Sequence, residues 1–97
     1  MLPQEVVDIV HDDIDAGIQR IPSLIAIFTR DPIRSLLEIE NEYDYILGYM
    51  IGIWTRTFSA YYTFVLHKTA SDADIMEQAE ILFNRLPEIK KAIRDNL

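Results

Sequence analysis

Cysteine is absent from this sequence of 97 residues, and turn-forming residues are scarce, with three glycines and four prolines. Without cysteine the chain can form neither a disulfide framework nor a thiolate metal site. So few turn residues disfavour a β-sandwich or barrel, which needs many short connections. No basic segment followed by an apolar run opens the sequence, so we expect no secretory signal and a reducing, cytoplasmic location.

A basic patch is also missing. Nine Lys and Arg residues stand against sixteen Asp and Glu, which gives a formal net charge of −7, and the cations are scattered along the chain. Proteins that bind nucleic acid usually neutralise phosphates with clustered cations. We therefore predict no nucleic-acid partner.

Apolar residues make up 49% of the chain and recur every three or four positions, which is the spacing of one helical face. The length suits one domain. We predict a single all-α domain over residues 1–97, folded as a helical bundle. The first apolar stripe consists of Val7, Val10, Ile14, Ile18, Ile21, Ile25 and Phe28.

Proline positions divide the first two thirds of the chain. Pro22 lies inside the first stripe and predicts a kink or a break in the first helix. Asp31 followed by Pro32 is typical of an N-cap and a first helical residue. No proline or clear loop signal follows until Lys68, so the pattern predicts one long central helix over about residues 32–68.

Two signals mark the last third of the chain. Ser71 and Asp74 have the spacing of a capping box, which predicts a helix start at that point. Pro87 predicts either the start of a short final helix or a kink within one.

The predicted central helix indicates self-association. At 1.5 Å per residue it would be about 55 Å long, which exceeds both flanking helical arms. It is apolar around most of its circumference after residue 43, and such a helix must be buried by something. Twofold dimers are the commonest closed assembly, so we predict a homodimer, with a further protein partner as a possibility.

A stripe of small residues follows one face of this helix at steps of four, three, four and four. Small side chains allow a second helix to approach closely, in the same chain or across a dimer; the alternative is a solvent-facing seam of small polar residues. Two glycines within a helix cost about 1 kcal/mol each relative to alanine, which favours the packing interpretation. The predicted interface comprises Gly48, Gly52, Thr55, Ser59, Thr63, Trp54 and Phe58.

Arg56 is the single formally charged residue between Tyr45 and His67. That segment is long enough to span a bilayer, but a charge near its middle costs about 2.5–3.5 kcal/mol on insertion scales, so we do not expect a membrane span. A cation within an apolar stretch must be paired, hydrated or functional. We predict an ion pair with an acid of the first helix or of a partner chain; exposure and contact with an anionic ligand are the alternatives.

Acidic residues of the first helix are weak candidates for a metal site. Asp8, His11, Asp12 and Asp15 share one helical face and could collect a divalent cation. One surface helix seldom supplies a full coordination sphere, because such sites usually recruit carboxylates from a second helix. We therefore favour a solvated acidic face and predict no metal and no cofactor.

A second acidic pair resembles half of an enzyme signature. Glu77 and Glu80 match the Glu-x-x-Glu half of the motif of all-α nucleotide pyrophosphohydrolases, whose second half is Glu-x-x-Asp. No such second half follows, and no family is recognised across the chain.

The sequence offers abundant apolar surface and no converging catalytic groups. We predict a non-enzymatic interaction or adaptor module that self-associates through its long apolar helix. One alternative is a small metal-dependent enzyme, similar to a nucleotide hydrolase, that uses the acidic helix faces. The other is a bundle that holds an apolar ligand among its aromatic side chains.

Overall fold

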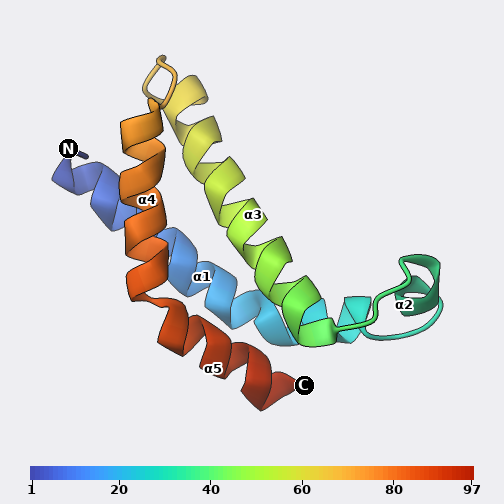
Figure 1. Ribbon diagram of the computed structural model, residues 1–97. Helices are drawn as coiled ribbons and strands as arrows, with labels where there is room; N and C mark the ends of the chain where they lie inside the picture. The colour runs from blue at the N-terminus through green and yellow to red at the C-terminus, as the bar shows by residue number, and fades with distance from the viewer.

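The computed structural model describes all residues, 1–97, and contains five helices and no strand (Figure 1). The predicted all-α bundle is confirmed. The helices are α1 (Gln4–Phe28), α2 (Ile33–Leu36), α3 (Glu42–Phe64), α4 (Asp72–Asn84) and α5 (Leu86–Asn96).

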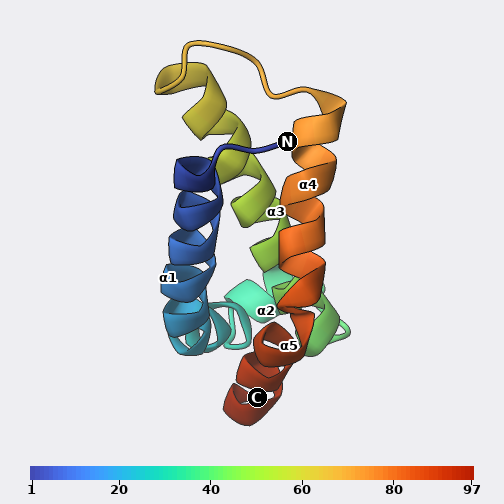
Figure 2. The same cartoon turned by 90° about the vertical axis from the view of Figure 1, so that its left-hand side faces the viewer.

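Four of the helices form the body of the molecule, and one lies apart from it. α1, α3, α4 and α5 all pack against one another, whereas α2 packs against α1 alone, is linked to α3 by the Arg34–Glu42 ion pair, and stands out at one end of the bundle (Figure 1). Seen from the side, α1 and α4 run along either side of α3, and α5 continues below α4 (Figure 2). α4 and α5, which follow one another in the chain, therefore both pack against the two long helices α1 and α3.

The prediction of one helix over 32–68 is wrong in its extent. α2 is a single turn, and α3 begins only at Glu42. Two local features separate them: Glu38 has a φ of 53°, which an α-helix cannot contain, and the Asn41 side chain accepts a hydrogen bond from the backbone nitrogen of Asp44 at 2.9 Å. Asn41 is thus the N-cap of α3, and its capping spacing was the overlooked signal.

The shorter α3 removes one argument for a dimer. Its 23 residues span about 35 Å, close to the roughly 38 Å of the 25-residue α1, so α3 is covered along its length within its own chain. None of the five helices combines the length and apolarity that crossing a membrane requires.

The proline and capping predictions had mixed outcomes. Of the kink or break predicted at Pro22, the break does not occur, because α1 continues through this residue; the ring lies on the exposed side, where the carbonyl of Ile18 loses its usual amide partner. The capping box is confirmed, because the Ser71 hydroxyl accepts from the Asp74 amide at 3.1 Å and the Asp74 carboxylate accepts from the Ser71 amide at 3.0 Å. Pro87 lies in the first turn of α5 and marks its start.

The core is a single cluster of apolar side chains from α1, α3, α4 and α5. Trp54, at the middle of α3, is 2% exposed and anchors this cluster. Its indole nitrogen donates to the backbone carbonyl of Asp13 on α1 at 3.1 Å. The buried apolar residues are Leu2, Val6, Val10, Ile14, Ile21, Leu24, Ile25, Ile46, Met50, Trp54, Phe58, Tyr62, Leu82, Ile89 and Ile93.

A glycine makes the contact between α1 and α3 possible. Gly17 lies directly against the Trp54 indole: a β-carbon added at this position would stand 2.5 Å from the indole nitrogen and 2.7 Å from Cζ2. Both distances are far below van der Waals contact. The α1–α3 spacing therefore requires a residue without a side chain at position 17.

A charged contact fixes the turn between α4 and α5 to α1. The guanidinium of Arg85 donates to the carbonyl of His11 at 3.1 Å and pairs with the carboxylates of Asp15 and Glu88. Its side chain is only 18% exposed, so the contact is sheltered from solvent on most sides. Arg85 thereby joins three helices at one point.

Gly17→Ala should destabilise the protein. The new methyl group forces the Trp54 indole or α1 to move, and overpacking of this kind lowers the free energy of unfolding by about 1–3 kcal/mol. Gly52→Ala is the matched control, because nothing lies within 4 Å of the place its methyl group would take, and helix propensity alone should raise stability by about 0.5–1 kcal/mol. Urea unfolding of both variants measures the two changes. Equal effects of the two substitutions would contradict the close contact.

Candidate functional site

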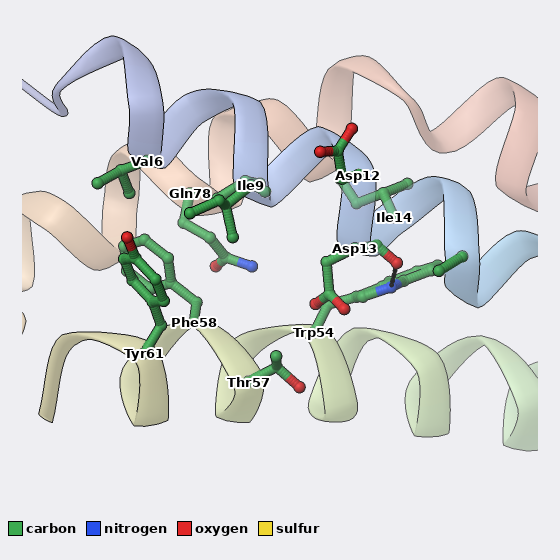
Figure 3. A pocket seen from close by; sticks show the side chains of 12 residues that line it. Val6, Ile9, Asp12, Asp13, Ile14, Trp54, Thr57, Phe58, Tyr61 and Gln78 are labelled. Atoms are coloured by element: carbon green, nitrogen blue, oxygen red, sulfur yellow. Dashed lines mark hydrogen bonds between the residues drawn. The ribbon is translucent and has the colours of Figure 1, made fainter. Parts of the chain in front are cut away.

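A groove between α1 and α3 holds the largest hollow with apolar walls, about 320 Å³ in volume. We call it the α1/α3 groove. α1 forms one wall, α3 forms the other, and a single residue of α4 closes the back (Figure 3). Its lining residues are Val6, Ile9, Val10, Asp12, Asp13, Ile14, Ala16, Trp54, Thr57, Phe58, Tyr61 and Gln78.

Gln78 is the α4 residue at the back of the groove. It is 1% exposed and is the only polar residue among the buried ones. Its amide points into the hollow between α1 and α3 (Figure 3), and its Oε1 atom has no hydrogen-bond partner. A buried acceptor without a partner costs about 1–3 kcal/mol. The groove therefore contains a buried hydrogen-bonding group without a partner.

Asp13 supplies a charged group at the side of the groove. Its carboxylate points from α1 across to α3, while the carboxylate of its neighbour Asp12 points away from the hollow (Figure 3). Burial raises the pKa of Asp13 above its ordinary value, and no charged neighbour contributes to this shift. The carboxylate is thus partly desolvated and uncompensated.

The groove continues past Trp54 into a smaller hollow of about 140 Å³. Asp13, Trp54 and Thr57 line both hollows, so the Asp13 carboxylate lies where the two meet. Arg20 lines only the smaller one. The main hollow therefore has no cationic side chain in its wall.

The chemistry of the groove suits recognition. Its walls are mostly aliphatic and aromatic, with a few polar groups at fixed places, which is the usual composition of a small-molecule site. The hydroxyls of Thr57 and Tyr61 have no histidine or lysine beside them in the lining to act as a base. The arrangement can bind and orient a ligand.

The predicted metal candidates of α1 do not converge. Asp15 pairs with Arg85, Asp8 accepts a hydrogen bond from the side chain of Gln4 at 2.9 Å, and Arg85 also occupies the His11 carbonyl. No group of three or more His, Asp or Glu side chains is placed to hold a metal ion.

The Glu-x-x-Glu pair of α4 is not assembled into a site either. The Glu77 carboxylate accepts from the backbone nitrogen of Leu2 at 2.9 Å and lies 3.1 Å from the amino group of Met1. The hydrogen bond from Leu2 is the main reason that the pKa of Glu77 is lowered. Glu80 is exposed. Glu77 thus ties the start of the chain to α4.

The predicted interface residues fall into two groups. Trp54 and Phe58 are buried in the core of the single chain, where they contact α1 and α4 neighbours and are not available to a second copy. The small-residue stripe lies on the outer side of α3: Gly48, Gly52 and Thr63 are exposed, whereas Thr55 and Ser59 are half-buried. The space beside both glycines is open, so no helix of this chain crosses there.

Arg56 forms no ion pair within the chain. Its side chain is exposed on α3, and each of the five salt bridges in the structure uses other residues. The predicted pair with an acid of the first helix is therefore absent from the single chain, and the pair with an acid of a partner chain stays a prediction. Of the three interpretations, exposure to solvent describes the single chain.

Sequence reasoning missed Gln78, Asp13 and Gly17. A signal for Gln78 existed, because it lies three residues after Ile75 and four before Leu82, on the apolar stripe of α4. A polar residue within such a stripe must find a partner or face a cavity. Nothing in the sequence separated Asp13 from its acidic neighbours or Gly17 from the other glycines.

Comparison of the chain with protein families, with curated proteins and with solved structures found no match in any of the three. Function is therefore inferred from the geometry of the α1/α3 groove and of the exposed surfaces.

Asp13→Asn should stabilise the protein at neutral pH and not in acid. Because the folded state raises the Asp13 pKa, it binds this proton more tightly than the unfolded chain does, and stability falls as the pH rises through and above about 3.9. The asparagine side chain does not ionise, so the variant does not lose stability as the pH rises. Thermal unfolding should show a higher Tm for the variant at about pH 7 and a shrinking difference toward about pH 4. Glu5→Gln, an exposed carboxylate of the same helix, is the control; a pH-independent difference for Asp13→Asn would contradict the desolvation.

Proposed function

We propose that the protein is a non-enzymatic helical binding module that accepts an apolar group in the α1/α3 groove. The observation that supports this is the unpartnered Gln78 amide at the back of an apolar hollow. Buried polar groups in proteins are almost always hydrogen-bonded, and exceptions call for a functional explanation. A bound molecule would supply the missing partner.

The dimensions of the groove agree with this proposal. Its volume of about 320 Å³ lies at the lower end of the range of about 300–1,000 Å³ that small-molecule sites occupy. Two aromatic residues, Phe58 and Tyr61, stand along its α3 wall opposite Val6 and Ile9 of α1 (Figure 3). A flat or slim apolar body could lie between these walls.

Metal-dependent hydrolysis receives no support from this geometry. The acidic side chains of α1 and α4 are engaged by Arg85, by the start of the chain or by solvent. They do not approach one another closely enough to form a shared site.

Filling the groove should block binding. Titration with 2-phenylethanol, a small neutral aromatic probe, should change the emission of Trp54, which is the only tryptophan and lines the groove. Thr57→Phe places a large side chain at the mouth of the hollow and should weaken the response about tenfold or more, equal to about 1.4 kcal/mol. Thr63→Phe, on the exposed outer stripe of the same helix, should leave the response unchanged. Equal responses in the two variants would refute a site in the groove.

Self-association is the second candidate, and exposed apolar side chains favour it. The segment around α2 carries Ile33, Leu36 and Leu37 on its surface, with Leu36 78% exposed, and no residue of α2 is buried. The open positions beside Gly48 and Gly52 would admit a helix of a second copy. In this proposal the protein acts as a homodimeric interaction module.

Gly52→Leu tests the outer stripe of α3 as a dimer contact. A leucine there would hold a neighbouring helix away and should shift the solution mass from about twice 11.3 kDa toward 11.3 kDa. Light scattering on the wild type and the variant measures this directly. A wild-type mass of 11.3 kDa at all concentrations would reject the dimer, and an unchanged dimer in the variant would place the contact elsewhere.

A further inference from the structure

The buried polar atom that the α1/α3 groove leaves without a partner is an acceptor. The buried Oε1 atom of Gln78 accepts and does not donate, and it has no partner. The carboxylate of Asp13 points across the groove, and no cation compensates it. The indole N–H of Trp54 is already used by the carbonyl of Asp13. A matching ligand must therefore bring donors.

The lining of the groove carries negative charge and no positive charge. Among its twelve lining residues two are aspartates and none is lysine, arginine or histidine. The hydroxyls of Thr57 and Tyr61 can donate or accept, so they favour neither sign. An anionic ligand would meet an uncompensated carboxylate in a partly desolvated place, whereas a cation would neutralise it.

We propose that the α1/α3 groove binds a small molecule with an apolar body and a protonated amine. The apolar body would lie along Val6, Phe58 and Tyr61, and N–H donors of the amine would meet the acceptors of Gln78 and Asp13. This inference rests on the proposed function, because it names the class of ligand that the same groove takes.

The geometry favours a small molecule over a segment of another protein. Gln78 of α4 lies at the back of the groove and is 1% exposed, so its acceptor is buried behind the walls formed by α1 and α3 (Figure 3). A helix laid across the mouth would cover the walls but would leave this amide unsatisfied. A small amine can enter far enough to reach it.

A pair of probes that differ only in the charged group tests the inference. 2-Phenylethylamine is protonated at neutral pH, and 2-phenylethanol has the same ring and chain with a neutral hydroxyl. The emission of Trp54 reports the binding of each to the intact protein. We expect the amine to bind about tenfold more tightly or better, because a hydrogen bond to a charged group contributes more than one between neutral groups.

Two variants test whether the preference for the amine comes from Asp13 and Gln78. Asp13→Asn should abolish the difference between amine and alcohol, because the charge is lost while the shape is kept. Gln78→Met keeps the length of the side chain and removes its amide, so it should weaken the amine about tenfold. Both variants should remain folded, since Asp13→Asn removes a partly desolvated charge and Gln78→Met removes a buried acceptor that lacks a partner. Glu5→Gln, which removes a charge from α1 outside the groove, should leave both affinities unchanged.

The outcomes separate this inference from the function on which it rests. Equal affinity for the amine and the alcohol, both lost in Thr57→Phe, would overturn the amine preference and leave an apolar binding site. An amine preference that survives in Asp13→Asn would also overturn it, because the attraction would then come from the overall negative charge. Absence of any response to either probe at millimolar concentration would reject the inference and the proposed groove together.

Discussion

The contact between Gly17 and Trp54 sets the spacing of the two long helices, and most of the remaining structure depends on it. The indole fits against α1 only because position 17 has no side chain. Its N–H then reaches the carbonyl of Asp13, one turn earlier on the same helix. This single aromatic side chain therefore fixes both how closely α1 and α3 approach and how they are aligned along their axes.

The same contact creates the candidate site. Trp54 contacts α1 at Gly17, and it lines the hollow of the α1/α3 groove together with Phe58 and Tyr61. Because the carbonyl of Asp13 is tied to the indole, its carboxylate is held at the side of that hollow (Figure 3). α4 contributes Gln78 from behind. The site is thus built by three helices whose relative positions are set by packing.

The two proposals for function use opposite sides of α3. Thr57 faces the groove and Gly52 faces outward; five residues separate them, which corresponds to about 140° around an α-helix. A ligand in the groove would leave the outer stripe free, and a second copy on the stripe would leave the groove open. The exposed apolar side chain of Leu36 belongs to α2, which stands out at one end of the bundle (Figure 1). The two activities are therefore compatible in one molecule.

The sequence by itself determined the class of the fold and several helix boundaries, because these depend on local periodicity and on caps made by near neighbours. The capping box of Ser71 and Asp74 and the start of α5 at Pro87 are of this kind. The break before α3 was also local, through Asn41, but its apolar surroundings resembled a continuing helix. Only the tertiary structure decided the rest: that Trp54 and Phe58 serve the core, that Arg85 and not Arg56 pairs with an acid of α1, and that Asp13 and Gln78 share a groove. Those facts depend on how α1, α3 and α4 pack in space. The spacing of residues along one helix does not specify which residues of other helices it will contact.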